Sequence, residues 1–498
     1  MPPPRLASLR RNASEAFVAS LSKRISFSLL LVLALAAPFP WGSVQPGWTG
    51  THKLLVLAFL SAAFAVAAPD ANLALGKAWI PVGALAGIGV LGGVQLLPLP
   101  GPILRVLSPA SLETWREAGK VLVAFGRTAP APRISLAPWE TAGVALLALA
   151  FASIFVAGAV TLDTRSRRRL FAVAVVASGI LQLLIAFGTE DRLSRLRGSF
   201  VNPNNFAGYL LIPLSFAFGL VWYRVRYEGK KLIDAGFADA RFKRMELLLP
   251  RVAGGIFLWG VLAAGLGMSQ SRGGIVAAAG GTVLLIALAV LHRRKGGHRL
   301  GGLMAGGLAV AVAGGTVFAL TATREIPFLR FLAQDTADLG HDGRVVIWRT
   351  SLKAFGLFPA LGSGLGCFRE AFRRVQPPDF TGLVDQAHDE YLQLLVTGGV
   401  IGALLGAVAI GSLLWILMDG FYRQPHREEA AWVLSSVGAL LLLLLHGSVE
   451  FNFSIPATPA MLAALAGGAW AAARWRHGAE AKSKPAPSPV SDADAAPL

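Results

Sequence analysis

Residues 387–393 bring together side chains that could perform acid–base chemistry. His388, Asp389, Glu390 and Tyr391 follow one another directly before a long apolar run. A histidine can take the proton of an attacking hydroxyl near neutral pH. Polar groups are costly to hold beside a membrane-embedded segment, so their gathering suggests a functional site. The alternative is a solvated helix start, where the helix dipole favours carboxylates.

Arginines occur in two other short polar segments, residues 195–204 and residues 269–274. A guanidinium group grips two phosphate oxygens at once and never loses its charge. Two such groups could neutralise a pyrophosphate. Arg272 is the stronger candidate for this role, because its turn is short and would hold the guanidinium group at the membrane edge. Arg272 could instead cap a helix hairpin or reach lipid headgroups, and Arg195 and Arg197 could be ordinary interfacial charges.

Neither a metal site nor a nucleotide site is indicated by the residue pattern. Asp385, Asp389 and Glu390 are close in sequence, but one helix start would explain them, and no cluster has metal-ligand spacing. The single cysteine, Cys367, excludes an intrachain disulfide framework and a cysteine-rich metal site. The glycines at 362, 364 and 366 follow no strand and precede no P-loop lysine. We therefore expect no metal and no cofactor.

The elements that must position these residues are transmembrane helices. The chain has 498 residues, of which 54% are hydrophobic and only 15% charged, whereas soluble proteins carry about 25% charged residues. The apolar residues form runs of roughly 18 or more, enough to cross a bilayer as helices. The net charge of +18 lies in short loops between these runs, so it indicates membrane orientation and no nucleic-acid partner.

We predict an all-α polytopic bundle of about twelve spans. The first apolar run follows basic residues without a clear cleavage site, so we interpret it as a retained helix. The expected spans cover residues 25–41, 52–68, 78–98, 138–162, 170–189, 204–223, 252–268, 273–291, 300–321, 389–417, 430–447 and 455–473.

Twelve spans place both termini on one side. Most Lys and Arg residues of the countable loops fall on that side, which the positive-inside rule assigns to the cytoplasm. The expected organisation is a cytoplasmic segment 1–24, spans one to nine over 25–321, a periplasmic loop 322–388, spans ten to twelve over 389–473, and a disordered cytoplasmic tail 474–498.

Two segments on the periplasmic side are long. Residues 99–137 are rich in proline and predict a surface excursion. In the loop 322–388, Val345, Trp348, Leu352 and Phe355 have helical spacing and predict an amphipathic helix over 343–356. A second short helix is expected over 368–375, and Cys367 should report the compartment of this loop to a thiol reagent.

Taken together, these residues resemble the O-antigen ligase/polymerase family of bacterial envelope glycosyltransferases. The resemblance covers roughly residues 190–470. Each motif alone is loose, but their order and spacing are fairly specific. The motifs lie at residues 197–204, 269–274, 344–348 and 362–366, and in the His388 segment with Gly399 and Gly402.

The family resemblance implies transfer of a glycan from a polyprenyl-pyrophosphate carrier to an acceptor hydroxyl in the periplasm, with two arginines and a histidine as the essential set. By motif, these are Arg197, Arg272 and His388, with Arg195 as the fallback for the first. Substrate contacts are expected from Arg195, Asn204, Arg344 and Tyr391. One departure is Asp389, where the family usually has Asn, Ser or Gln after the histidine.

The sequence predicts a metal-independent, inverting glycosyltransferase of the bacterial inner membrane. It would act as a polymerase, joining lipid-linked repeats, or as a ligase, moving the finished glycan onto lipid A-core or protein; the motifs match both. Its partners would be the donor, the acceptor and membrane lipids, and a chain-length regulator is a further candidate partner. The alternatives are a twelve-span polysaccharide or lipid transporter or flippase, which more often shows two similar halves, and a non-catalytic scaffold.

Overall fold

The computed structural model describes residues 4–45, 50–68, 71–189, 195–237, 241–294, 343–378, 380 and 382–475. These residues form helices and connecting turns, with no β-strand among them, as predicted. The elements are α1 (Pro4–Ala36), η1 (Trp41–Ser43), α2 (Thr51–Val66), α3 (Ala71–Leu75), η2 (Gly76–Ala78), α4 (Trp79–Leu96), α5 (Gly101–Leu107), α6 (Pro109–Ala124), α7 (Pro138–Thr161), α8 (Arg165–Thr189), α9 (Pro203–Leu232), η3 (Ile233–Phe237), α10 (Arg241–Met268), α11 (Arg272–Arg294), α14 (Gly343–Leu357), α15 (Phe368–Arg373), α16 (Glu390–Arg423), α17 (Arg427–Gly447), η5 (Asn452–Ser454) and α18 (Ala457–Arg474).

The number of spans differs from the twelve expected. Within the described ranges, nine helices are long and apolar enough to cross a membrane. The helix Thr51–Val66 is apolar but has only 16 residues. The last expected span is the 18-residue α18, which is rich in Ala and Gly and does not count among the nine. The expected span 300–321 and nearly all of the predicted tail 474–498 lie outside the described residues.

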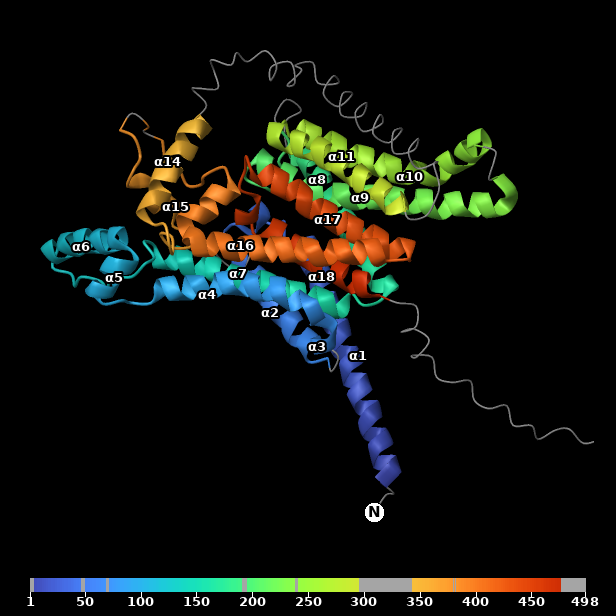
Figure 1. Cartoon of the computed structure of the whole chain (residues 1–498), viewed down its shortest axis with the longest axis horizontal. Coiled ribbons are helices and arrows are strands. Elements are labelled where there is room, and N and C mark those ends of the chain that lie inside the picture. Colours follow the sequence, from blue (N-terminus) through green and yellow to red (C-terminus); the bar gives the residue numbers. More distant parts are fainter. Residues whose placement is uncertain are drawn as a thin grey trace, which may run out of the picture.

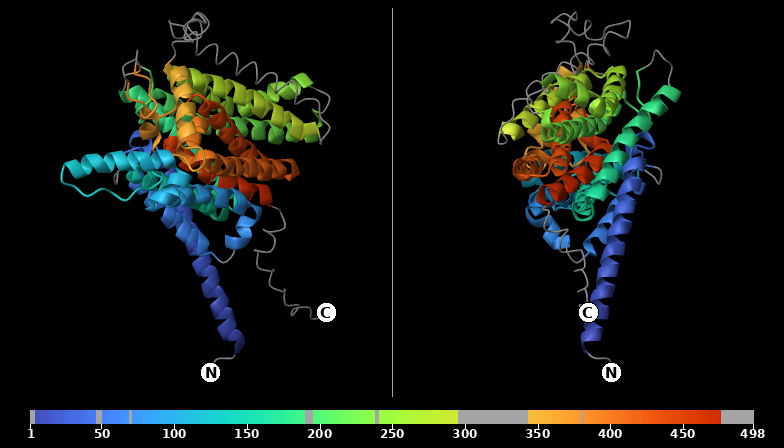
Figure 2. Two further views of the ribbon diagram at one scale, coloured as in Figure 1. Left: turned by 60° about the vertical axis from the view of Figure 1, so that its left-hand side comes forward. Right: turned by 90° about the vertical axis from the view of Figure 1, so that its right-hand side faces the viewer.

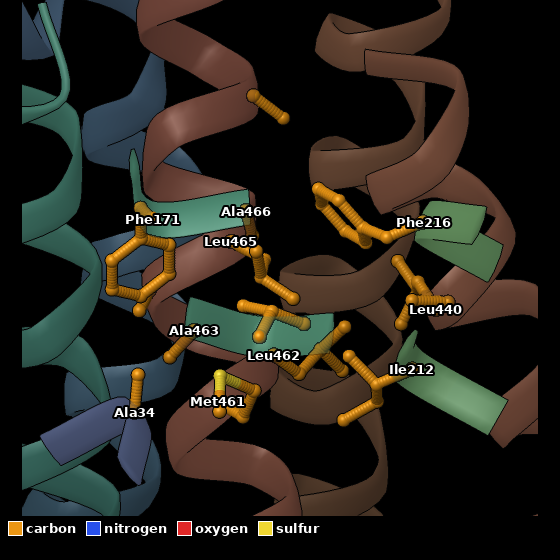
Figure 3. Close-up of a cluster of buried hydrophobic side chains, with 14 of the residues drawn as sticks. Ala34, Phe171, Ile212, Phe216, Leu440, Met461, Leu462, Ala463, Leu465 and Ala466 are labelled. Carbon is orange, nitrogen blue, oxygen red and sulfur yellow. The ribbon is translucent and has the colours of Figure 1, made fainter. Parts of the chain in front are cut away.

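The core of the bundle surrounds α18. This helix is apolar on all sides and almost wholly buried, as a helix enclosed by other helices must be. Figure 3 shows its side chains between those of α8, α9 and α17. The labelled contacts come from Phe171, Ile212, Phe216, Leu440, Met461, Leu462 and Leu465.

Small residues allow α7 and α18 to cross closely. A Cβ added to Gly158 would lie 2.6 Å from the carbonyl oxygen of Ala464, and one added to Gly467 would overlap the backbone of Phe155. Close backbone approach through Gly and Ala is how helices associate where lipid removes the hydrophobic driving force. The glycine content of the chain is partly explained by this packing.

The two ends of the bundle differ in composition. At one end, on the left of Figure 1, α5 and α6 extend beyond the long helices, and α14 and α15 pack against α16. At the other end, α9 and α10 form a hairpin, and the side chains at the starts of α8 and α17 form ion pairs with one another. There the buried Glu429 accepts hydrogen bonds from Arg165 at 2.7 Å and from Arg168 at 3.1 Å. Much of the basic charge assigned to the cytoplasm by sequence therefore gathers at one end.

Helices also form in the segments expected to lie at the membrane surface. The Pro-rich residues 99–137 fold as α5 and α6, and Figure 2 shows them projecting from the bundle. The predicted helix over 343–356 is α14, and α15 confirms the second short helix. The buried face of α14 is, however, Ile347, Thr350, Ser351 and Ala354. The apolar residues expected to face the membrane surface, Val345, Trp348, Leu352 and Phe355, are partly exposed. This is because α14 packs on the bundle through the adjacent face.

One long helix, α16, is broken near its start. Gly399 has φ 64° and ψ −166°, which no other residue type adopts readily. The freed amides of Val400 and Ile401 donate to the carbonyls of Pro359 and Ala360 at 2.8 and 3.2 Å. On the other side of the break, the amides of Ser363 and Gly364 donate to the carbonyls of Val396 and Thr397, at 3.0 and 3.2 Å.

We call this pairing of residues 359–364 with residues 396–401 the glycine clasp. Irregular backbone at membrane depth is tolerated only where protein satisfies it, and the clasp does so. Gln95 completes it by donating to the carbonyls of Leu361 and Thr397. Two glycine motifs that are separate in sequence are thus one structural unit, which joins the segment before α15 to the helix that follows His388.

Candidate functional site

The turn before α11 holds Arg272 at a helix N-terminus. Gln270 takes a left-handed conformation, with φ 52°, and reverses the chain after α10. Ser271 is buried, and its hydroxyl accepts from the amide of Gly274 at 3.2 Å. Ser271 therefore caps the helix, which leaves Arg272 exposed as the first residue of α11. Ser271, and not Arg272, is therefore the residue whose side chain caps α11.

Arg195 is tied to the same turn. Its Nε donates to the carbonyl of Ser269 at 3.0 Å, and its Nη2 donates to the carbonyl of Gln270 at 3.4 Å. The same Nη2 donates to Oδ1 of Asn204 at 2.7 Å. Asn204 is the second residue of α9, placed there by Asn202 as N-cap and Pro203 at the first position. The start of α9 and the start of α11 are thereby joined through one guanidinium group.

Glu450 lies at the centre of these contacts. Its side chain is only 1% exposed and lies within hydrogen-bonding distance of side chains from three segments. Oε1 accepts from Asn204 Nδ2 and from Arg344 Nη2, both at 2.5 Å. Oε2 lies 3.3 Å from Nδ1 of His388. A buried carboxylate requires such partners to offset its desolvation, so Glu450 orders the beginning of α9, the beginning of α14 and the His388 turn together.

The turn at His388 is held on both sides. His388 has φ 50°, an uncommon left-handed conformation for a residue with a side chain. Before it, the amide of Ala387 donates to Oε1 of Gln393 at 2.7 Å. After it, Asp389 caps α16 and accepts from two amides at 2.9 Å. The imidazole packs edge-on against Phe451, with ring centres 5.0 Å apart, so its direction is fixed on the Glu450 side.

The other polar residues of the His388 segment make structural contacts. Partial burial raises the pKa of Asp389, opposed by the backbone amides that it caps. Glu390 accepts from the amides of Phe453 and Ser454, at 2.5 and 3.4 Å. The hydroxyl of Tyr391 donates to the carbonyl of Leu444 at 2.8 Å. The helix-start interpretation therefore accounts for Asp389 and Glu390, while His388 has the contacts of a positioned side chain.

Of the predicted site residues, the structure brings Arg195, Asn204, Arg344 and His388 into one hydrogen-bonded network, with Arg272 on the adjoining turn. Arg197 has an exposed side chain, and its carbonyl accepts from the amide of Phe200 at 2.9 Å. The hydroxyl of the neighbouring Ser199 donates to the backbone carbonyl of Pro38 and to the side-chain Oε1 of Gln182. This part of the loop is therefore bound to the turn after α1 and to α8. Tyr391 lies on α16 beside the network.

Positive charge is concentrated at this network. Partial burial lowers the pKa of Arg195, the carboxylate of Glu450 raises it, and the nearby charges of Arg272 and Arg344 lower it further. The guanidinium groups of Arg272 and Arg344 and the carboxylate of Glu450 therefore all lie within electrostatic reach of Arg195. Such an excess of fixed positive charge favours an anion with about two negative charges.

Two other expectations concern metals and cysteine. Across the ranges that the structure describes, no group of three or more His, Cys, Asp or Glu residues could hold a metal ion. Cys367 is fully buried, and burial raises the pKa of its thiol. It is therefore a poor reporter of compartment, contrary to the sequence-based expectation.

Sequence reasoning missed Glu450. The residue stands in the short connection between α17 and α18, where a lone carboxylate between two apolar runs was a usable signal. What the sequence could not show is that this connection lies against residues some 60 to 250 positions away, as the bonds to His388, Arg344 and Asn204 demonstrate.

Comparison with known proteins gave one family match. A search of curated proteins gave no match. A family model described as O-antigen ligase matches residues 256–407, a range that includes Arg272, Arg344, the glycine clasp and His388. This match over residues 256–407 confirms the resemblance to the O-antigen ligase/polymerase family.

Proposed function

We propose that this protein transfers a glycan from a polyprenyl-pyrophosphate carrier to an acceptor hydroxyl at the periplasmic face of a bacterial inner membrane. The family domain supports a membrane enzyme that ligates or polymerises glycans. The observation that carries the finer proposal is the meeting of Arg195, Arg344 and His388, with Arg272 alongside, around Glu450 at one end of the helix bundle.

The pyrophosphate of the donor would lie against Arg272 and Arg195. Arg272 begins a 23-residue helix, and a helix N-terminus adds favourable potential for phosphate to that of the guanidinium itself. Arg195 is held in place by two carbonyls of the same turn. We assign Arg195 rather than Arg197 because its described bonds join it to the Arg272 turn and to Asn204. Arg344, bonded to Glu450, adds charge and docks α14.

His388 would accept the proton of the acceptor hydroxyl. The hydroxyl oxygen then forms a bond to the anomeric carbon as the bond from that carbon to the pyrophosphate oxygen breaks. The leaving pyrophosphate takes the electron pair, and its growing charge is stabilised by the arginines. The proton moves to the imidazole, and a single displacement inverts the anomeric centre.

The distribution of charge supports the proposed side of the membrane. The site end of the bundle is opposite to the end where α8 and α17 begin and where α9 and α10 carry many Lys and Arg. The positive-inside rule places that basic end in the cytoplasm. The site would then face the periplasm, where lipid-linked glycans and their acceptors meet.

An assay with purified protein in detergent tests the proposal. The donor is a polyprenyl-pyrophosphate glycan, and the acceptor is either a second donor molecule or lipid A-core, so that product size separates polymerase from ligase. We expect His388→Ala to lower transfer about 10²–10⁴-fold with donor binding retained. Arg272→Lys should lose about 10²-fold or more, because lysine lacks the planar fork.

Controls make this assay decisive. Arg349→Lys changes an exposed arginine of α14 outside the network and should leave transfer unchanged. Added EDTA should not slow the wild-type protein if arginines carry the charge of the pyrophosphate. Full activity of His388→Ala or Arg272→Lys would overturn the assigned roles, and inhibition by EDTA would show that a metal takes part.

A further inference from the structure

We propose that Glu450 is a positioning residue that holds the neutral imidazole of His388 with its proton on Nδ1. This inference rests on the proposed function and adds a residue that lies outside the matched range 256–407. The motif comparison pointed to the two arginines and the histidine, and only the fold brings Glu450 to them.

Glu450 faces the Nδ1 nitrogen of His388. Its Oε2 lies 3.3 Å from Nδ1 of His388, while its Oε1 is occupied by Asn204 and Arg344. A carboxylate only accepts hydrogen bonds. The neutral imidazole is therefore held with its proton on Nδ1, which leaves Nε2 unprotonated as the nitrogen that can act as a base.

The burial of Glu450 makes this arrangement rigid. The carboxylate is 1% exposed, whereas the imidazole is 30% exposed. The base is thus open to substrate and its partner is not. Two donors on Oε1 prevent the carboxylate from rotating toward solvent. Other charged or titratable groups that act near Glu450 are Arg195, Glu390 and His446.

Glu450→Gln tests whether the carboxylate sets the tautomer of His388, because glutamine has nearly the same size and shape as glutamate. The amide oxygen would remain opposite Asn204 and Arg344, which can only donate there. The amide nitrogen would then face Nδ1 of His388 and donate to it. The proton of the neutral imidazole would be forced to Nε2, and the base would be lost without loss of the side chain.

The measurement is the nitrogen spectrum of histidine-labelled protein, with the His388 signal assigned by its absence in His388→Ala. We expect the Nδ1–H form in the wild type and the Nε2–H form in Glu450→Gln. The turnover number should fall about 10²–10⁴-fold, the range of general-base contributions, with the KM for donor little changed. Glu450→Asp keeps an acceptor and should retain the Nδ1–H form. Asp385→Asn is the control, since it removes an exposed carboxylate of the same segment and should alter neither property.

The outcomes separate this inference from the proposed function. An Nε2–H form in the wild type, or a Glu450→Gln protein with an unchanged spectrum and full turnover, would overturn the role of Glu450. Failure of the wild type to transfer any glycan would instead overturn the proposed function, and the spectra would still test the contact. If Glu450→Gln does not fold, the spectra of the wild type and Glu450→Asp decide alone.

Discussion

Replacement of Gly399 by Ala should strongly destabilise the protein, because Gly399 is the break in α16 on which the glycine clasp depends. Its dihedral angles, φ 64° and ψ −166°, lie in a region essentially restricted to glycine. An added Cβ would overlap the carbonyl oxygen of Ala360 and would lie 2.5 Å from the amide nitrogen of Gly362. Both atoms belong to backbone that is itself hydrogen-bonded, so neither can move cheaply.

The expected size of the effect follows from the same contacts. Forcing a residue with a side chain into this conformation costs about 1–3 kcal/mol. Displacing residues 359–362 would break the bonds from Val400 to Pro359 and from Ile401 to Ala360, each worth about 0.5–1.5 kcal/mol. The total loss is about 2–6 kcal/mol, which is large against the marginal stability of proteins.

The assay compares unfolding midpoints in detergent, followed by tryptophan fluorescence, together with the amount of protein in the membrane. Gly402→Ala is the matched control, three residues along the same helix. Its added Cβ would lie 3.4 Å from Leu91 and 3.6 Å from Leu394, which is ordinary contact, so its midpoint should stay near that of the wild type. Equal midpoints for Gly399→Ala and Gly402→Ala would refute the reasoning about the clasp.

Two further predictions concern the site arginines and the orientation. Arg195→Ala should reduce transfer far more than Arg197→Ala, because the described bonds of Arg195 join it to the Arg272 turn and to Asn204; the reverse order in a transfer assay would return the pyrophosphate role to Arg197. A membrane-impermeant thiol reagent should label Leu383→Cys, at a position 63% exposed, in intact spheroplasts, while the wild type with its buried Cys367 stays unlabelled. Labelling of Leu383→Cys only after lysis would place the site in the cytoplasm.

The site was partly predictable because its chemistry lies in residue types that are rare among apolar runs. His388, Arg272 and the neighbouring arginines Arg197 and Arg195 stand out in a chain with only 15% charged residues. The choice between Arg195 and Arg197 was not predictable, because both occupy the same loop two residues apart. The preference proposed for Arg195 rests on its bonds to Ser269 and Asn204, which depend on the fold. Glu450 was missed because its partners are distant in sequence.

The sequence by itself determined the all-helical membrane class, most of the helix positions and the family, since apolar run length and local motifs are properties of short segments. The tertiary structure decided what depends on contacts between distant segments. It showed that α18 is enclosed by its neighbours, although α18 is not one of the nine helices of the described ranges that are long and apolar enough to cross a membrane. It joined the glycines at 362 and 364 to Gly399 in one clasp. It also placed the carboxylate of Glu450 between Arg344 and His388, because buried polar groups select partners by position in space and not by position in the chain.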